Sequence, residues 1–302
     1  MILAPLRGVT IRCFRETFAE AIRDVGFTEA ITPFITAAAG YDPLRDRELA
    51  NRPVDPSAGL PDNQSISQSG NRTILLTPQF IGKDPAALRT CLEKVRDAGY
   101  ETADLNAGCP FPMVRNKGRG SGLLRTPDVL RRMLEVGCET MGPGKFSLKT
   151  RLGVERTDEL LKLMPMINLF PLRFLAVHAR TAKQMYDGEI DAAALDRVRQ
   201  VAEVPLVVNG DLPLPPQSDG SLMIGRSFVR YLGTRDDIGA LLDRYIAASQ
   251  AELSGDRPVV GRLKELLAYW KELPRWKRRW PVLKLVRTVD ELRSVLASSP
   301  VG

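Results

Sequence analysis

Short apolar runs alternate with amphipathic stretches along residues 1–233 of the chain. Two of the amphipathic stretches begin like helices, because Asp84-Pro85 and Thr126-Pro127 each place an N-cap residue before a first-turn proline. The apolar runs are typical of buried parallel strands, and there are eight: MILAPL (1–6), FTEAITPF (27–34), TILLTPQFIG (73–82), TADLNAG (102–108), FSLKTRLG (146–153), FLAVHAR (174–180), VPLVVNGD (204–211) and LMIGRSF (222–228). Eight strand–helix units predict a (β/α)8 TIM barrel.

Two segments depart from this alternation. Residues 52–73 form a polar stretch rich in Gly, Pro and Ser between the second and third strands, where we expect a flexible loop. After the seventh strand, where a helix is due, the chain reads DLPLPPQSDGS (211–221). Proline lacks the backbone N–H that a helix interior requires, so we expect the seventh barrel helix to be missing.

From Thr234 onward the pattern is helical throughout. The segments 236–253, 258–273 and 288–299 are amphipathic and carry no strand signal, so we expect an all-helical C-terminal domain at 234–302 after a barrel at 1–233. Its centre interleaves aromatic with basic side chains, a pattern that suits RNA through stacking and phosphate neutralisation; these include Trp270, Trp276, Trp280, Lys277, Arg278 and Arg279. The alternative is that the tryptophans fill a helical core and the charges are simply solvated.

Composition narrows the class of protein. The chain has 302 residues, of which 44% are hydrophobic and 26% charged, an ordinary globular balance, and no apolar run approaches the roughly 20 residues of a membrane helix. Four cysteines without CxxC spacing and a single histidine predict neither disulfides nor a metal site. A net charge of +7 favours an anionic partner such as nucleic acid. We expect a cytoplasmic monomer with no membrane contact.

Polar and cationic residues end the predicted strands. Chemistry in such barrels lies at the carboxyl ends of the strands, and these ends carry Pro5-Leu6-Arg7, Gln79, Asn106 with Cys109, Lys149 with Arg151, His178 with Arg180, Asn209-Gly210-Asp211, and Gly225-Arg226. The last two turns contain glycine, as do barrel loops that bind phosphate through backbone N–H groups. The sequence therefore predicts one polar site at the barrel mouth.

These strand ends resemble the tRNA-dihydrouridine synthase family, whose members are FMN-dependent barrels with a C-terminal helical domain that bind tRNA. The resemblance covers nearly the whole chain and rests on motifs in family order: APLRGVT (4–10), DLNAGCP (104–110), GRGSGLL (118–124), KTRLG (149–153), VHARTAKQMYDG (177–188), VVNGD (207–211) and MIGR (223–226). It implies reduction of the C5–C6 bond of a tRNA uridine, with NADPH re-reducing the FMN.

The resemblance implies that Cys109 is the catalytic general acid. In the family a hydride passes from reduced flavin to C6 of uracil, and the cysteine thiol protonates C5 from the opposite face. A thiol of ordinary pKa, about 8.5, stays neutral as such an acid must, and we expect it on a flexible loop that closes on a flipped base. Cys13, Cys91 and Cys138 lie on helical patterns, where packing is the expected role.

Cofactor contacts are implied as well. Lys149 and His178 resemble the ligands beside the flavin N1–C2 edge, where positive charge stabilises the reduced anion, and Gln79 matches a hydrogen-bond partner of the isoalloxazine ring. Backbone contacts are implied for Pro5, Leu6 and Arg7, and ribityl or phosphate contacts for Asn209, Gly210, Asp211, Gly225 and Arg226. From the residues alone, structural turns explain the glycines equally well.

Further residues are implied to contact RNA. Asn106, Arg151 and Tyr186 match positions that read the uracil edge or guard its pocket. Arg180 and Lys183 are expected to face RNA phosphates. Taken as residues alone, Asn106 also suits a strand-end turn, His178 a satisfied core histidine, and Tyr186 a packing aromatic.

Two other functions remain open from the sequence. One is an FMN barrel that reduces a small molecule, for which the basic helical tail has little use. The other is a non-catalytic RNA-binding relative, in which Cys109, Lys149 and His178 would be free to change. Flavin binding without tRNA binding favours the first, and tRNA binding without flavin favours the second.

Overall fold

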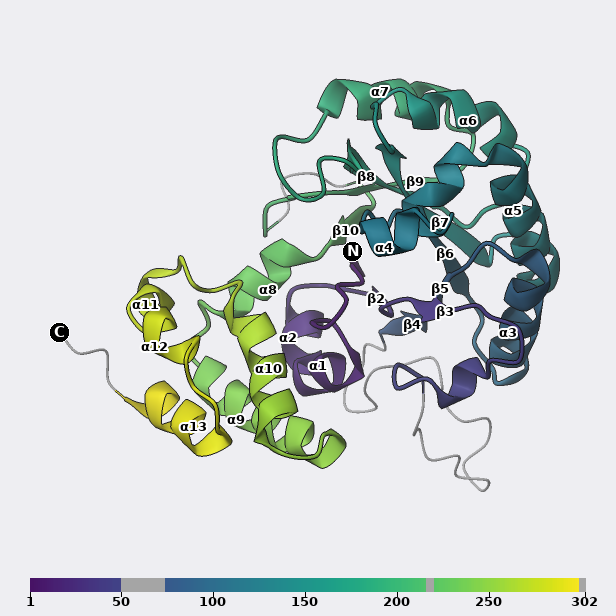
Figure 1. Cartoon of the computed structure of the whole chain (residues 1–302). Coiled ribbons are helices and arrows are strands. Elements are labelled where there is room, and N and C mark those ends of the chain that lie inside the picture. The colour runs from purple at the N-terminus through teal and green to yellow at the C-terminus, as the bar shows by residue number, and fades with distance from the viewer. Residues whose placement is uncertain (50–73, 216–219, 299–302) are drawn as a thin grey trace.

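One parallel sheet forms the centre of the protein (Figure 1); the computed structural model describes residues 1–49, 74–215 and 220–298. The sheet has ten strands in the order β3-β5-β6-β7-β8-β9-β10-β1-β2-β4, and each neighbouring pair is parallel. The strands are β1 (Ile2–Leu3), β2 (Glu29–Ile31), β3 (Ile35–Thr36), β4 (Leu75–Thr77), β5 (Gln79–Ile81), β6 (Ala103–Ala107), β7 (Phe146–Gly153), β8 (Leu175–Thr181), β9 (Leu206–Asn209) and β10 (Leu222–Ile224).

The sheet closes on itself where two strands are interrupted by proline. Pro78 alone separates β4 from β5, and Pro33 lies between β2 and β3. Because β2 pairs with β4 and β3 pairs with β5, the two ends of the strand order are the same pair of chain segments. Thr32 bridges the break, since its N–H donates to the Thr77 carbonyl and its Oγ1 accepts from the Gln79 N–H, both at 3.0 Å. The predicted barrel of eight strand units is confirmed.

Helices surround the barrel, and along the chain most of them alternate with the strands. They are α1 (Arg12–Thr17), α2 (Ala19–Asp24), the short 3-10 helix η1 (Pro43–Arg45), α3 (Pro85–Asp97), α4 (Pro112–Arg115), the 3-10 helix η2 (Gly120–Arg125), α5 (Pro127–Met141), α6 (Glu159–Ile167), α7 (Ala192–Val201) and α8 (Arg226–Leu232). Asp84 caps α3 as predicted, accepting from the N–H groups of the first turn. The side-chain cap predicted for Thr126 is wrong, because its hydroxyl donates back to the Leu123 carbonyl.

The seventh strand–helix unit lacks its helix in the part of the loop that the structure describes. Residues 210–215 and 220–221, between β9 and β10, contain none. The polar loop predicted at residues 52–73 lies outside the described residues.

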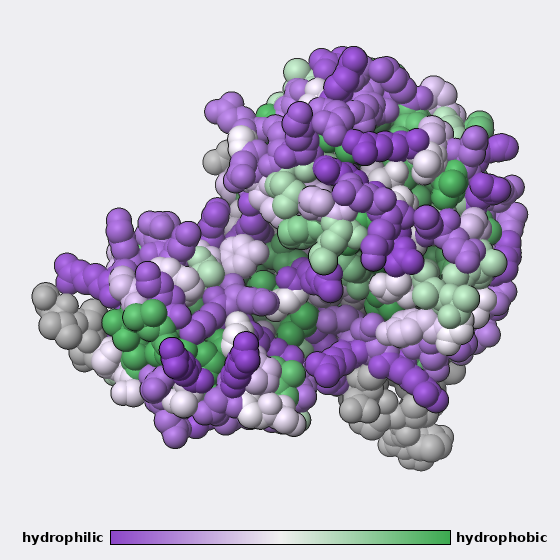
Figure 2. Space-filling model, in the orientation of Figure 1, coloured by the Kyte–Doolittle hydropathy of each residue, from purple (hydrophilic) through white to green (hydrophobic). Residues whose placement is uncertain are grey.

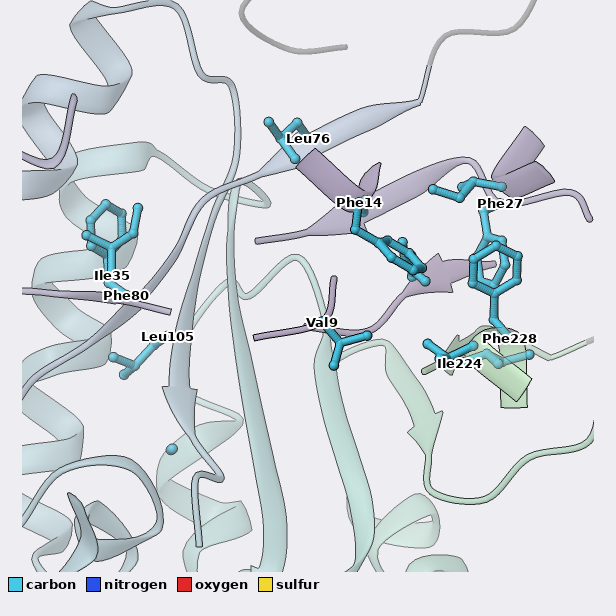
Figure 3. Packing of buried hydrophobic residues seen from close by; sticks show 14 of the residues in the cluster. Val9, Phe14, Phe27, Ile35, Leu76, Phe80, Leu105, Ile224 and Phe228 are labelled. Atoms are coloured by element: carbon cyan, nitrogen blue, oxygen red, sulfur yellow. The ribbon is translucent and has the colours of Figure 1, made fainter. Parts of the chain in front are cut away.

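Alternate residues of the strands build two separate cores. The residues of the smaller cluster, which alternate along the strands with members of the larger one, face the inside of the barrel: Ile2, Ala4, Ile31, Phe174, Ala176, Val207 and Met223. The larger cluster lies between sheet and helices. There Phe27 packs edge-on against Phe228 with ring centroids 5.0 Å apart, and Ile224 lies beside Phe228 (Figure 3).

A C-terminal helical region follows α8 and packs beside α1 and α2 (Figure 1). It consists of α9 (Ile238–Glu252), α10 (Asp256–Leu267), α11 (Pro274–Lys277), α12 (Trp280–Leu283) and α13 (Val289–Ala297). Arg12 of α1 forms an ion pair with Glu252 of α9 at 2.6 Å, and Phe14 packs edge-on against Tyr245. The helical tail is therefore confirmed, while the domain boundary at 233/234 stays a prediction.

The tryptophans of the tail bury themselves against the end of α8. Trp270 and Trp276 are 0% and 2% exposed, and their indole N–H groups donate to the Val229 and Gly233 carbonyls at 2.6 and 2.7 Å. Stacking on RNA is therefore wrong for these two side chains, because burial leaves no ring face for a base. The alternative of a helical core holds for them.

Gly137 of α5 lets the helix approach the sheet closely. A Cβ atom there would lie 2.0 Å from Cε1 of Phe146 on β7. Gly137→Ala is expected to lower the free energy of unfolding by about 1–3 kcal/mol, since overpacking outweighs the gain in helix propensity. Gly261→Ala in α10, where a Cβ meets nothing within 4 Å, is the control, with an expected gain of about 0.5–1 kcal/mol. Urea unfolding measures both, and equal effects would contradict the packing argument.

Candidate active site at the barrel mouth

A cavity opens at the carboxyl ends of the strands. Most of the site residues expected from the sequence line it: Pro5, Leu6, Arg7, Gln79, Asn106, Cys109, Lys149, Arg151, His178, Tyr186, Asn209, Gly210, Asp211, Gly225 and Arg226. Arg180 lies behind this lining, and Lys277, Arg278 and Arg279 belong to the helical tail. The barrel thus brings together residues that are up to about 220 positions apart in the chain.

Cys109 follows β6 in a tightly bonded turn. Its backbone N–H donates to Asn106 Oδ1 at 2.8 Å, and its carbonyl accepts from the N–H and hydroxyl of Ser121 at 3.1 and 2.9 Å. Gly120, at φ +56°, fits alongside, where a Cβ would lie 2.8 Å from that of Cys109. Both backbone groups of Cys109 are therefore hydrogen-bonded in this turn, and closure of the loop on a flipped base stays a prediction.

The thiol of Cys109 is suited to holding its proton. Its residue is 7% exposed, and burial raises the pKa of the thiol above its ordinary value, against smaller lowering effects from the Phe111 backbone and nearby cations. A neutral thiol at pH 7 is a proton donor rather than a nucleophile. The other three cysteines are buried on α1, α3 and α5, as packing predicts.

Two cations of β7 project toward the same cavity. Lys149 Nζ donates to Asn209 Oδ1 at 3.1 Å, and burial, followed by the charge of Arg151, lowers the pKa of Lys149 to about 8. Arg151 is almost fully buried, and its guanidinium donates to the carbonyls of Gly108, Thr181 and Met185 at 2.9, 3.0 and 2.6 Å. These three hydrogen bonds connect Arg151 to the loops around the cavity, so Arg151 positions the Cys109 turn as well as lining the pocket.

The Asn106 side chain also hydrogen-bonds within the turn that follows β6. Its Oδ1 accepts from the N–H groups of Gly108 and Cys109, and its Nδ2 donates to Gln79 Oε1 at 2.9 Å. The strand-end turn, one of the two roles left open by the sequence, is present in the structure.

His178 is neutral and its tautomer is set by a neighbour. Arg180 Nη1 lies 3.1 Å from His178 Nε2, and because a guanidinium can only donate, Nε2 accepts and the ring proton is on Nδ1. Burial, and then the charges of Arg151 and Lys149, hold the pKa of His178 well below its usual range. His178 can therefore donate one hydrogen bond but brings no positive charge.

The expectation that Arg180 faces RNA phosphate is wrong. Arg180 is 3% exposed, and its guanidinium donates to the Gly188 carbonyl at 2.6 Å and to Asp211 Oδ2 at 2.5 Å. The strand-end pattern places it correctly on β8 but gives no sign of the loop that folds over it. Lys183, by contrast, is exposed and lies 3.6 Å from Glu155.

Asp211, Arg226 and Tyr186 line the cavity together. Asp211 pairs with both Arg180 and Arg226, and the Arg226 guanidinium lies 5.0 Å from the centre of the Tyr186 ring. Arg151 contacts the same ring at 5.2 Å. Tyr186 is 38% exposed, so one part of this cation-bound ring remains open to a ligand.

The two glycine turns allow close backbone approach. A Cβ at Gly210, whose φ is +117°, would lie 2.7 Å from Cδ2 of His178, and a Cβ at Gly225 would lie 3.1 Å from that of Ala4. Both contacts are with the neighbouring strand segment, so a larger residue at either position would collide with His178 or Ala4.

The basic residues of the tail lie on the surface. Lys277 and Arg278 are exposed, while Arg279 donates to the Ser298 carbonyl and lies 5.9 Å from the Trp276 ring. Hydrophilic residues cover most of the face that Figure 2 shows, over barrel helices and C-terminal helices alike. In the described ranges no helix is long and apolar enough to cross a bilayer, and no group of His, Cys, Asp or Glu is arranged to hold a metal ion.

Sequence reasoning missed several residues of the site region, among them two aromatic side chains and two buried polar ones. Phe34 and Phe111 line the cavity, and Arg7 lies 5.2 Å from the Phe34 ring. Asp104 and Ser147 are fully buried behind Gln79. A carboxylate and a hydroxyl inside apolar strand runs were the available signal, because buried polar groups need partners.

Comparisons with known proteins agree with one another. A family model described as Dihydrouridine synthase (Dus) matches residues 2–220. The tRNA-dihydrouridine synthase B of Vibrio cholerae is 28% identical over 75% of this chain and 66% of its own length, and the tRNA-dihydrouridine(16) synthase of Shigella flexneri is 27% identical over 90% and 89%. The chain thus spans about two thirds of the Vibrio relative. An old yellow enzyme homologue from Zymomonas mobilis, 13% identical with a TM-score of 0.51 over 76% of this chain and 85% of that one, shares the fold.

Proposed function

This chain belongs to the dihydrouridine synthase family, and from that premise we propose that it reduces the C5–C6 bond of a uridine in tRNA, with FMN bound and NADPH as electron donor. The observation that carries the proposal is one cavity lined by both a buried neutral thiol, Cys109, and a partly buried cation, Lys149. Reduction of a conjugated double bond by a flavin needs a proton donor, and it gains from a cation beside the reduced ring.

The residues present fit FMN. Four cations line the cavity (Arg7, Lys149, Arg151 and Arg226), whereas Asp211 is the carboxylate among the lining residues. This excess of positive charge suits a phosphate and an anionic reduced ring. The two glycine turns described above also line the cavity, and we propose that the phosphate end of FMN lies against their backbone.

Each residue has a distinct part in this proposal. Bound FMN supplies the hydride. Cys109 holds at Sγ the proton that the product carries at C5, and Lys149 supplies positive charge inside the cavity. His178 offers its Nδ1–H, Gln79 its amide, and Tyr186 an aromatic wall for the substrate base.

Uridine 16 is the position that we propose as the target. The alignment with the relative whose name specifies position 16 extends over 90% of this chain, whereas the alignment with the Vibrio synthase B covers 75%. We also propose that the helical tail contacts tRNA through Lys277, Arg278 and Arg279.

Nucleoside mass spectrometry of unmodified tRNA incubated with the FMN-loaded protein and NADPH tests the function. We expect dihydrouridine at position 16, located by sequencing of the reacted tRNA, and none without NADPH. Dihydrouridine at another position would overturn only the choice of target. If the bound flavin oxidises NADPH but tRNA stays unmodified, the activity is that of a small-molecule reductase.

Removal of the three basic tail residues is expected to weaken tRNA binding in a salt-dependent way. We expect replacement of Lys277, Arg278 and Arg279 with alanine to make the negative slope of log K, the tRNA association constant, against log salt shallower by about 2–3, if each residue neutralises one phosphate. Filter binding between 50 and 200 mM salt would measure this. A control removes the same charge from Arg131, Arg132 and Lys145, which are exposed on α5 and before β7. An equal loss in both variants would indicate a general charge effect.

A further inference from the structure

A row of buried hydrogen bonds runs from the barrel interior to the Cys109 turn. Asp104 of β6 is 0% exposed; its Oδ1 accepts from the Ser147 hydroxyl at 2.6 Å and its Oδ2 from Gln79 Nε2 at 2.8 Å. Gln79 Oε1 accepts from Asn106 Nδ2 at 2.9 Å. Gln79 lines the cavity, whereas Asp104 lies behind it.

The chemistry of each group fixes the direction of the next hydrogen bond. When the Asp104 carboxylate is ionised, at alkaline pH, it can only accept, so Gln79 must then turn its nitrogen to Asp104 and its oxygen to Asn106. Asn106 must then present its oxygen to the N–H groups of Gly108 and Cys109, as observed at 3.1 and 2.8 Å. A flipped Gln79 would set oxygen against oxygen at Asp104 and nitrogen against nitrogen at Asn106.

We propose that Asp104 is a positioning residue: it sets the direction of hydrogen bonds through Gln79 and Asn106 and so holds the backbone of Cys109. The same direction leaves the second amide hydrogen of Gln79 for a ligand in the cavity. The importance of both consequences rests on the proposed function, in which Cys109 is the acid and the cavity binds FMN.

The row of hydrogen bonds needs an acceptor at position 104 rather than a negative charge. A matched pair of variants can separate these two properties. In Asp104→Asn, the side-chain oxygen can accept from Gln79 while the nitrogen donates to the Ser147 hydroxyl, which can act as an acceptor. Asp104→Leu keeps the branched shape of the side chain, with larger methyl groups in place of the oxygens, but has no acceptor, so Gln79 is free to flip. Ser147→Ala removes the other partner of Asp104 and leaves the link to Gln79 intact.

Alkylation of Cys109 by iodoacetamide reads out the position of the turn directly. The full-length FMN-loaded protein is treated at pH 8 without tRNA or NADPH, and each cysteine peptide is followed by mass spectrometry. We expect Asp104→Leu to raise the Cys109 rate about tenfold, the factor that corresponds to about 1.4 kcal/mol, with Asp104→Asn and Ser147→Ala within about twofold of the parent protein. Cys13, Cys91 and Cys138 serve as internal references, since general loosening would raise all four rates.

Three results would overturn the proposal: an unchanged Cys109 rate in Asp104→Leu, an equal rise in Asp104→Asn, or a parallel rise of all four cysteines. If Asp104→Leu does not fold, Gln79→Met removes the next link and is expected to give the same tenfold rise; an unchanged rate there counts against the proposal. Because no tRNA is present, these results stand whether or not the protein forms dihydrouridine.

Discussion

Replacement of Cys109 by alanine is expected to lower kcat for dihydrouridine formation by about 10²–10⁴-fold, while NADPH still reduces the bound flavin at the parent rate. The first effect follows because alanine has no proton to give at the place where the buried thiol of Cys109 holds one. The second follows because flavin reduction by NADPH does not use that proton. Single-turnover formation of dihydrouridine and stopped-flow bleaching of the flavin measure the two steps separately.

Matched variants separate acid catalysis from packing. Cys109→Ser replaces the thiol with a hydroxyl of similar size. Because a hydroxyl is a weaker acid than a thiol, we expect activity between those of the parent and the alanine variant. Cys138→Ala removes a buried thiol from α5, away from the cavity lining, and is expected to cost stability without changing kcat. A Cys109→Ala protein with parent activity on tRNA would show that another group is the acid.

The barrel was predictable because parallel strands buried on both faces leave apolar runs, and each run survives in the structure. The prolines that interrupt two of these runs, Pro33 and Pro78, were visible in the sequence, but their effect on the pairing of the strands could not be predicted. Whether a proline breaks a strand or closes a barrel depends on the strand beside it, and Thr32 supplies the bridging hydrogen bonds here. Likewise, two buried tryptophans and a basic surface share one stretch of sequence in the tail, and only packing separates them.

Most of the candidate site was predictable because the end of every parallel strand reaches the same mouth. What the pattern left open was the direction of each side chain. Arg180 follows His178 by two positions and so lies on the same face of β8. A returning loop nevertheless covers Arg180, and its guanidinium donates to the Gly188 carbonyl and to the Asp211 carboxylate. Asp104 was missed because the role of a carboxylate in an apolar run becomes clear only when its hydrogen-bond partners on neighbouring strands are known.

Asp104 also gives the protein a pH-dependent stability. Burial raises the pKa of Asp104 from 3.8 to about 7, although hydrogen bonds from Ser147 and Gln79 favour the ionised form. The folded state therefore binds more protons than the unfolded state between pH 3.8 and pH 7, and stability falls as pH rises through this window. Above pH 7 the ionised carboxylate costs the fold about 4 kcal/mol relative to its protonated form.

Asp104→Asn removes this titration and is expected to gain stability over the parent protein as pH rises, by about 2 kcal/mol between pH 5 and pH 7. Urea unfolding of both proteins at several pH values measures the difference, and groups that titrate in both, such as His178, cancel from it. Ser147→Ala is the matched control, because it keeps the carboxylate but removes a hydrogen bond that lowers its pKa, so the fall with pH should become steeper toward neutrality. A pH-independent difference between Asp104→Asn and the parent would show that the carboxylate titrates alike in the folded and unfolded states.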